Sequence, residues 1–170
     1  LLTQILGTSR TIAMENPTYR QAYRVFESLG CQMKPVEMDA HGMNVRLLEE
    51  SGADIAYVMP SHQYPMGVVM PVKRRQELLS WAGRGEKRYL IEDDYDSEFR
   101  YRGKPVPALQ GMDIQGKVIY MGTFSKSIAP AIRVGYLVLP APLLAVYKRK
   151  CGFYASTVSR IDQKIIYQFL

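Results

Sequence analysis

The sequence predicts an α/β protein, a three-layer α/β/α sandwich built on a mainly parallel sheet. Two observations predict this fold class. Short apolar runs without a clean alternation of polar and apolar residues recur along the chain, which is typical of strands covered on both faces. Segments with helical spacing of apolar residues, or loops, separate these runs, as in an α/β fold.

The first expected strand covers residues 11–16 and ends at the turn Asn16-Pro17. In the second, Pro35 cannot donate a ladder hydrogen bond, so we expect that strand at a sheet edge. The expected strands are residues 11–16, 31–38, 54–59, 88–91, 118–121 and 134–139.

The first expected helix covers residues 18–29, where apolar residues recur every three or four positions and Gly30 supplies a stop signal. Pro71 favours the first turn of a later helix, and Gly83 follows its end. The expected helices are residues 18–29, 44–51, 71–82, 141–150 and 157–170.

Composition limits the class of protein. The chain has 170 residues, of which 47% are hydrophobic, which suits one globular domain or part of a larger one. Its net charge of +6 favours phosphate-bearing partners without identifying nucleic acid. Cys31 and Cys151 have no metal-ligand spacing, so we predict no metal site and a cytoplasmic location. The apolar stretch 127–147 contains Arg133 and three prolines, which argues against a membrane span.

The ends of the chain suggest a piece of a longer protein. The sequence does not begin with methionine, and its last six residues continue an apolar helical pattern without a stop signal.

Polar residues gather where the expected strands end. In open α/β sheets, ligands bind at the carboxyl ends of the strands, so these segments are the candidate site. They are residues 15–19, 60–65, 92–96 and 122–126.

Lys126 is the candidate nucleophile. A partly desolvated lysine can act as an amine nucleophile and form a Schiff base, although a lone loop lysine is usually solvated. Thr123, Ser125 and Arg133 could bind a phosphate with two hydroxyl groups and a guanidinium. The alternative is ordinary turn capping by the two hydroxyl residues.

Asp93 and Tyr95 follow the expected strand 88–91. A carboxylate at a strand end needs a cationic partner, and a protonated pyridine nitrogen would serve. Tyr95, two residues on, would lie on the same face and could hydrogen-bond a ring oxygen. An acidic Mg²⁺ or Ca²⁺ site and a solvated acidic loop remain alternatives.

The other candidates have competing roles. Tyr19 could stack on a flat cofactor or could pack against the following helix. His62 could contact a cofactor or cap a turn. The basic clusters at residues 73–75, 84–88, 100–104 and 148–150 are interpreted mainly as solvated faces, some of which could contact DNA backbone.

Four motifs in order carry a family resemblance: ENPTY, PSHQYPMG, LIEDDYDSEFRY and VIYMGTFSKSIAPAIRVGYLVLP. They resemble the large domain of fold-type-I pyridoxal-phosphate enzymes, most closely the aminotransferase-like domain of MocR-type regulators in the GntR family. The resemblance covers about residues 11–170, and its last two motifs are the specific ones.

The resemblance implies a role for each matching residue. Lys126 would hold pyridoxal phosphate as a Schiff base, Asp93 would pair with the pyridine nitrogen, and Tyr95 would bond the phenolic oxygen. Tyr64 takes the position at which aminotransferases place an asparagine. By the same resemblance, Tyr19 would stack on the ring, and the phosphate would be bound by Thr123, Ser125 and Arg133.

The resemblance also implies the function. The chain would be a partial large domain, residues 1–170, that lacks the glycine-rich phosphate loop and the C-terminal small domain. It would act as the effector domain of a homodimeric regulator, sensing an amino acid or amine and reaching DNA through a domain absent from this chain. The alternatives are a class I/II aminotransferase and a truncated fragment that binds nothing.

Overall fold

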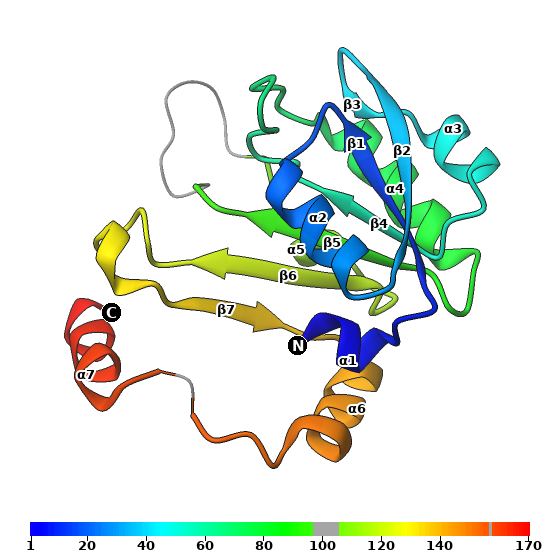
Figure 1. Cartoon of the computed structure of the whole chain (residues 1–170). Helices are drawn as coiled ribbons and strands as arrows, with labels where there is room; N and C mark the ends of the chain where they lie inside the picture. Colours follow the sequence, from blue (N-terminus) through cyan, green and yellow to red (C-terminus); the bar gives the residue numbers. More distant parts are fainter. Residues whose placement is uncertain (97–105, 157) are drawn as a thin grey trace.

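The computed structural model describes residues 1–96, 106–156 and 158–170 (Figure 1). The strands are β1 (Thr11–Asn16), β2 (Gln32–Asp39), β3 (Gly42–Met43), β4 (Ile55–Val58), β5 (Tyr89–Asp94), β6 (Val118–Thr123) and β7 (Gly135–Val138). The helices are α1 (Leu2–Leu6), α2 (Arg20–Ser28), α3 (Val45–Glu50), α4 (Val72–Gly83), α5 (Leu109–Met112), α6 (Ala141–Cys151) and α7 (Arg160–Phe169), with a 3₁₀ turn at Pro130–Ile132.

The strands form one sheet in the order β3-β2-β1-β4-β5-β6-β7. The five adjacent strands β2, β1, β4, β5 and β6 run parallel, whereas β3 and β7 pair antiparallel at the two edges. Strand order reverses between β1 and β4, because β2 lies on one side of β1 and the later strands lie on the other. This parallel arrangement brings the ends of β1, β4, β5 and β6 to one edge of the sheet.

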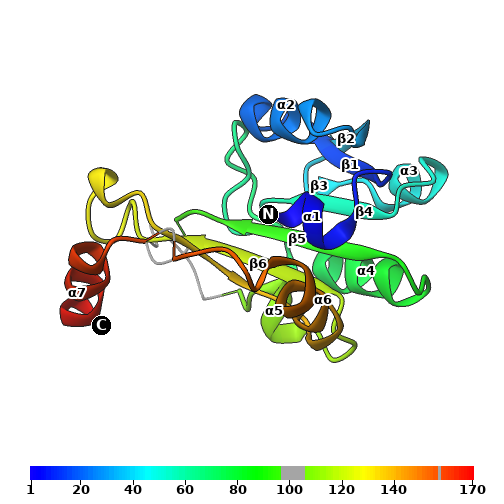
Figure 2. The same cartoon turned by 60° about the horizontal axis from the view of Figure 1, so that its bottom comes forward.

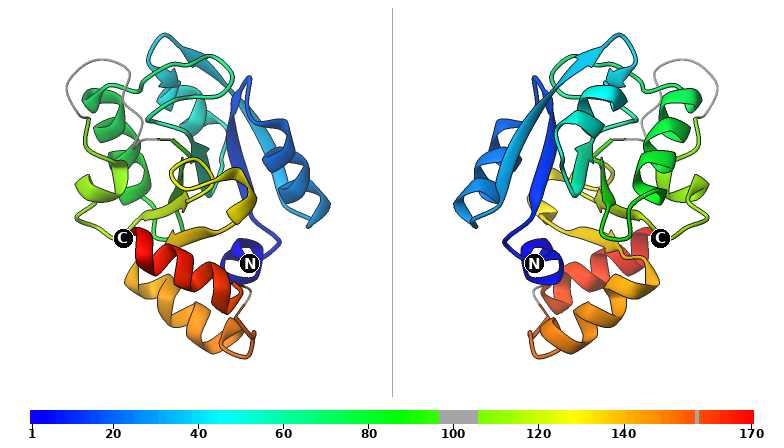
Figure 3. Two further views of the ribbon diagram at one scale, coloured as in Figure 1. Left: turned by 90° about the vertical axis from the view of Figure 1, so that its left-hand side faces the viewer. Right: turned by 90° about the vertical axis from the view of Figure 1, so that its right-hand side faces the viewer.

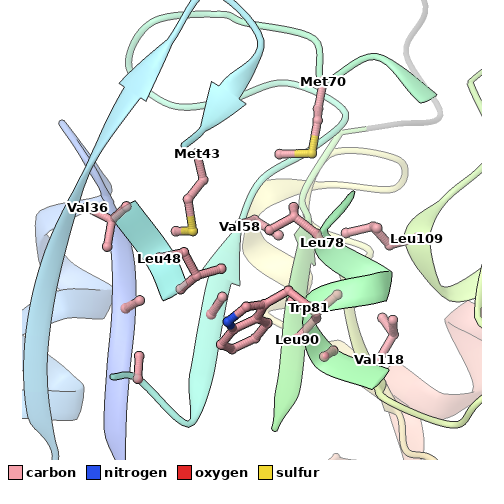
Figure 4. Close-up of a cluster of buried hydrophobic side chains, with 14 residues drawn as sticks. Val36, Met43, Leu48, Val58, Met70, Leu78, Trp81, Leu90, Leu109 and Val118 are labelled. Atoms are coloured by element: carbon pink, nitrogen blue, oxygen red, sulfur yellow. The ribbon is translucent and has the colours of Figure 1, made fainter. Parts of the chain in front are cut away.

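Helices cover both faces of the sheet, which confirms the predicted three-layer α/β/α architecture (Figure 2). On one face α3, α4 and α5 pack on a core centred on Trp81, which is fully buried (Figure 4). On the other face α1, α2 and α6 pack on a second core that contains Phe26 and Tyr57. At one end of this second layer α1 lies beside α6 (Figure 3).

Most expected strands lie within a few residues of their predicted bounds, and residues 11–16 match exactly. The prediction that β2 is an edge strand is wrong, because β3 lies outside it. Even so, β3 pairs only with Met38 and Asp39, so beside Pro35 the strand β2 has a neighbour on one side only. The short elements α1, β3 and α5 had no expectation from the sequence, since each is too short for periodicity to appear.

The expected helices are also present, with shifted ends. Tyr19 directly precedes the first residue of α2, and Pro71 directly precedes the first residue of α4. Pro71 is therefore the N-cap residue of α4, whereas the sequence predicts it in the first turn of that helix. The Asn44 side chain caps α3 by accepting hydrogen bonds from the backbone N–H groups of Arg46 and Leu47. None of the side chains of α7 is buried, and this helix stands apart from the sheet in Figures 1 and 2.

The interpretation of the basic cluster 73–75 as a solvated face is wrong for Arg75, which is 1% exposed. Its guanidinium donates to the carbonyl oxygens of Pro60 at 2.8 Å, Met70 at 3.0 Å and Pro107 at 2.9 Å. It lies 3.8 Å from the buried Glu92, whose carboxylate accepts the backbone N–H groups of the first two residues of α5. Arg75 therefore holds both ends of the loop 60–70.

Some predictions fall outside the described residues. These are the second part of the acidic motif, residues 97–101, and the basic cluster 100–104. Within the described residues, no helix combines the length and the apolar character that crossing a membrane requires.

Glu15, near the end of β1, is 1% exposed, and neither of its carboxyl oxygens has a hydrogen-bond partner among the described residues. Burial raises the pKa of Glu15 from 4.5 to about 7, although the nearby N–H groups of Met59 and Met43 and the Gln63 side chain act to lower it. The folded chain therefore favours the neutral form of this carboxyl group.

We expect Arg75→Met to lower the free energy of unfolding by about 3–5 kcal/mol, because it leaves Glu92 as a buried charge without a cation. The control is Arg84→Met, since Arg84 pairs with Glu49 at the exposed surface, and it should change stability by less than about 1 kcal/mol. Urea denaturation of the two variants measures both values. Equal losses in the two variants would contradict the role given to Arg75.

We expect the stability of the chain to fall as pH rises from about 4.5 to 7, because the folded state keeps a proton on Glu15 that the unfolded state releases. Glu15→Gln should remove about 3 kcal/mol of this pH dependence, and the control Glu27→Gln on the exposed face of α2 should not. Urea denaturation at pH 5 and pH 8 gives the comparison. A pH dependence that persists in Glu15→Gln would refute this assignment.

Candidate functional site

A cavity of about 610 Å³ lies at the edge of the sheet where the parallel strands end. Eight of the nine candidate residues from the sequence line it, together with Met59, Met121, Val134 and Gly135, and the ninth, His62, does not. The eight are Tyr19, Tyr64, Asp93, Tyr95, Thr123, Ser125, Lys126 and Arg133.

Topology explains this convergence. Tyr19 follows β1, Tyr64 follows β4, and Asp93 lies near the end of β5. Thr123 ends β6, and Arg133 precedes β7. Because β7 runs antiparallel to β6, with Gly135 opposite Thr123, the start of β7 lies at the same edge as the end of β6.

Asp93 faces the cavity and has a single hydrogen-bond partner among the described residues, the Tyr57 hydroxyl group. Burial raises the pKa of Asp93, and the charges of Asp94 and Asp96 act in the same direction. Within the described part of the chain, no lysine, arginine or histidine forms an ion pair with it. Asp93 is therefore a carboxyl group beside a cavity without a compensating cation.

Lys126 lies beside Asp96, with 3.3 Å between Nζ and Oδ2, and its amine also lies 4.6 Å from the centre of the Tyr95 ring. The Asp96 carboxylate is nearly buried and also contacts His62 Nδ1 at 3.0 Å. The side chain of Lys126 is half exposed. The amine is therefore held at the cavity by an ion pair while it remains open to a ligand.

Tyr95 shares its face of the sheet with Asp93, as their spacing predicts, but its hydroxyl group already has a partner. It donates to the carbonyl oxygen of His62 at 2.9 Å. Burial raises the pKa of Tyr95 to about 12, with smaller effects from the neighbouring carboxylates. To donate to a ligand, this hydroxyl group would have to leave His62.

His62 stacks on Tyr95, with 6.4 Å between ring centres, and it is not among the residues that line the cavity. The sequence left two roles open for His62, contact with a cofactor and capping of a turn. In the structure His62 lies behind Tyr95, where its Nδ1 contacts the Asp96 carboxylate.

Thr123, Ser125 and Arg133 belong to the connection between β6 and β7. The Thr123 hydroxyl group accepts the Ser125 backbone N–H at 3.1 Å and lies 3.1 Å from the Ser125 hydroxyl group. Arg133 adopts the left-handed backbone conformation, with φ of 49°, directly after the 3₁₀ turn. A non-glycine residue in this conformation is uncommon, and here it reverses the chain so that Arg133 lines the same cavity as the two hydroxyl groups.

Tyr19 and Tyr64 lie together at the mouth of the cavity. Their rings meet edge to face, with 6.0 Å between centres and an angle of 88°. Both are partly exposed, at 41% and 52%. Tyr19 is therefore not a buried core residue, although its hydroxyl group contacts the following helix by donating to Gln21 Oε1 at 2.8 Å.

The acidic segment 92–96 does not gather its carboxylates into one site. Glu92 faces Arg75 and α5, and Asp94 accepts a hydrogen bond from Tyr120, whereas Asp93 faces the cavity. This alternation follows from the pleat of β5. Among the described residues, no group of three or more potential metal ligands comes together.

Besides Val134 and Gly135, four residues with a role at the site were not singled out by sequence reasoning. Tyr57 bonds Asp93, Met59 and Met121 form apolar walls, and Gln63 holds the loop that carries Tyr64. The alternation of β4 contained a signal for two of them, because Tyr57 and Met59 are two residues apart and share a face. No sequence signal marked the hydrogen bonds of Gln63.

The cavity thus combines three chemical features. One group of residues offers a guanidinium and two hydroxyl groups to an anion, a carboxyl group offers a place for a cation, and a lysine amine is available for covalent attachment. Apolar and aromatic walls suit a planar ring.

Known proteins resemble this chain in sequence and in fold. An uncharacterised HTH-type transcriptional regulator of Bacillus subtilis, YdeL, is 41% identical over all of this chain and 36% of its own length. The probable rhizopine catabolism regulatory protein MocR of Rhizobium meliloti is 40% identical over 84% of this chain and 29% of its own length. The chain thus spans about a third of the length of these curated relatives.

Among solved structures, kynurenine aminotransferase of Pyrococcus horikoshii, in complex with PMP, is similar with a TM-score of 0.76. It is 31% identical, and the match covers 89% of this chain and 41% of that one.

The sequence model of the family described as aminotransferase class I and II matches residues 1–169. Since this match extends over nearly the whole chain, and since the fold and the arrangement of strand ends agree with it, the chain belongs to the class I and II aminotransferase family.

Proposed function

We propose that this chain is the pyridoxal-phosphate-binding, aminotransferase-like effector domain of a MocR-type transcriptional regulator of the GntR family. The cavity would hold the cofactor, attached to Lys126 as a Schiff base. Two facts support this proposal: the family match, and the high similarity to proteins named as transcriptional regulators.

The observation that carries the cofactor assignment is the state of Asp93. Its carboxyl group lies beside the cavity, has the neutral Tyr57 hydroxyl group as its partner, and has a raised pKa because of burial. A protonated pyridine nitrogen would supply the missing cation. When bound, pyridoxal phosphate supplies an aldehyde that condenses with amines and a ring that accepts electrons.

Lys126 supplies the amine for covalent attachment. Its Nζ would hold the cofactor covalently, since an amine is the group with which an aldehyde condenses. The Asp96 carboxylate lies 3.3 Å from this amine and holds it beside the cavity. The Tyr95 ring beneath the amine keeps it near the cavity.

The connection between β6 and β7 would bind the phosphate group. Arg133 contributes a guanidinium with several N–H donors, and Thr123 and Ser125 contribute hydroxyl groups. Tyr19 would stack on the ring, and Tyr64 would donate to its phenolic oxygen. Tyr95 would donate to the same oxygen after leaving the His62 carbonyl oxygen. Met59 and Met121 would exclude water from the ring faces.

We extend the proposal to the partners of the whole protein. The ligand sensed at the site would be an amino acid or another amine, which can exchange with Lys126 for the aldehyde. The protein would form a homodimer in the cytoplasm and would reach DNA through a domain that is not part of this chain.

A second candidate is a class I/II aminotransferase, which the similarity to a kynurenine aminotransferase favours. Incubation of the protein with amino acids and a 2-oxo acid distinguishes the two. Repeated conversion of the amino acid supports the enzyme, whereas a spectral change without turnover supports the effector domain. A third candidate, a fragment that takes up no cofactor, predicts no spectral change at all.

We expect Lys126→Ala to abolish covalent attachment of pyridoxal phosphate, because the variant lacks the amine that forms the imine bond. Absorbance reports the Schiff base, and borohydride reduction followed by peptide mass mapping locates it. The control Lys148→Ala on α6 should label as the parent does. A label that remains in Lys126→Ala, or maps to another lysine, would exclude this assignment.

We expect Arg133→Ala to weaken binding of pyridoxal phosphate by about 1.5–3 kcal/mol, or roughly ten- to a hundredfold in Kd, through the loss of a charge-assisted contact. Binding of pyridoxal, which lacks the phosphate group, should change little. Titrations of both compounds, with Arg149→Ala as the control, make the comparison. Equal weakening for both compounds would show that Arg133 acts on something other than the phosphate.

A further inference from the structure

Two loops carry the aromatic rings at the mouth of the cavity. Residues 16–19 lead from β1 into α2 and carry Tyr19, and residues 60–70 lead from β4 toward α4 and carry Tyr64. The two loops are far apart in the sequence, so their spacing has to be fixed by contacts between them.

Gln63 provides such a contact. Its amide nitrogen donates to the carbonyl oxygen of Pro17 at 2.9 Å and to that of Tyr64 at 2.8 Å. Its amide oxygen accepts the backbone N–H of Met66 at 3.0 Å. Both donors and the acceptor are therefore used, and the residue is only 2% exposed.

The bond from Gln63 to Pro17 is the one hydrogen bond that joins these two loops, which lie entirely within the described residues. The other bonds of Gln63 stay inside its own loop, where its backbone pairs with Val68 and Gly67. Gln63 is not among the residues that line the cavity, so it contacts no ligand there. Its effect on the site would pass through the two tyrosines.

We propose that Gln63 is a positioning residue that sets the spacing of Tyr19 and Tyr64. Its side chain ties the backbone two residues before Tyr19 to the backbone of Tyr64 itself, so the two rings keep their edge-to-face contact. The proposal rests on the proposed function in one respect, namely that the rings enclose pyridoxal phosphate.

The side chain needs both its length and its amide for this role. Asparagine is one methylene shorter and cannot bridge the same span, and methionine has the length but no donor. Both variants leave the Pro17 carbonyl oxygen without this partner. An unmade hydrogen bond at a buried site weakens the arrangement that it held.

The first readout uses the cofactor-free chain. In the parent, nuclear Overhauser contacts between the Tyr19 and Tyr64 rings should be present, because the rings are adjacent. We expect Gln63→Met to lose these contacts while most other amide resonances stay in place. Gln32→Met is the matched control, since Gln32 contacts Thr11 at the opposite end of the sheet. If Gln63→Met fails to fold, Gln63→Asn takes its place.

The second readout is affinity for pyridoxal phosphate. We expect Gln63→Met to weaken binding roughly tenfold, the range of one or two lost hydrogen bonds. In a Tyr19→Ala background the same change should have much less effect, because the ring that Gln63 positions is already absent.

The outcomes separate the two proposals. Retained contacts between the rings in Gln63→Met, or an affinity loss that adds fully to that of Tyr19→Ala, would overturn the role of Gln63. If the parent takes up no pyridoxal phosphate, the proposed function fails, while the ring contacts in the cofactor-free chain still decide whether Gln63 sets their spacing.

Discussion

The site depends on one buried cation, the guanidinium of Arg75. It binds the carbonyl oxygens at the two ends of the loop 60–70 and neutralises Glu92, the neighbour of Asp93 on β5. Because Glu92 in turn accepts the first N–H groups of α5, a single side chain links the loop 60–70, β5 and α5. Burying this charge costs desolvation free energy. Burial accordingly lowers the pKa of Arg75 and raises the pKa of Glu92. The cost is met by three carbonyl bonds, and the result is a loop whose two ends have fixed positions.

The pleat of β5 divides the acidic segment between two tasks. Glu92 and Asp94 point to the face of α4 and α5, where they are satisfied by protein groups, and Asp93 points to the cavity. Consecutive carboxylates thus serve structure and ligand binding separately. The antiparallel turn into β7 complements this division, since it returns Arg133 to the edge where β6 ends. The carboxyl group of Asp93 and the guanidinium of Arg133 thus reach the same cavity, one from β5 and the other from the loop between β6 and β7.

Much of the fold followed from sequence patterns, because buried parallel strands and amphipathic helices have strong signals. Residues 11–16 show this best, with exact agreement. The cavity residues could be listed because they follow strands, and parallel strands share an edge. The contacts of polar side chains with backbone groups far away in the sequence could not be predicted. Arg75 looked like part of a basic surface cluster, and Gln63 looked like an ordinary loop residue, since the carbonyl groups they bind are up to 46 residues away. The order of β2 and β3 at the edge also escaped, because a two-residue strand has no periodicity.

The contact between Tyr57 and Asp93 has a consequence for the order of events in the life of the chain. The phenol gives the acid a hydrogen-bond partner from within the same sheet, so this carboxyl group has one even while the cavity holds no ligand. Under the proposed function, folding of the polypeptide would therefore not have to wait for the cofactor.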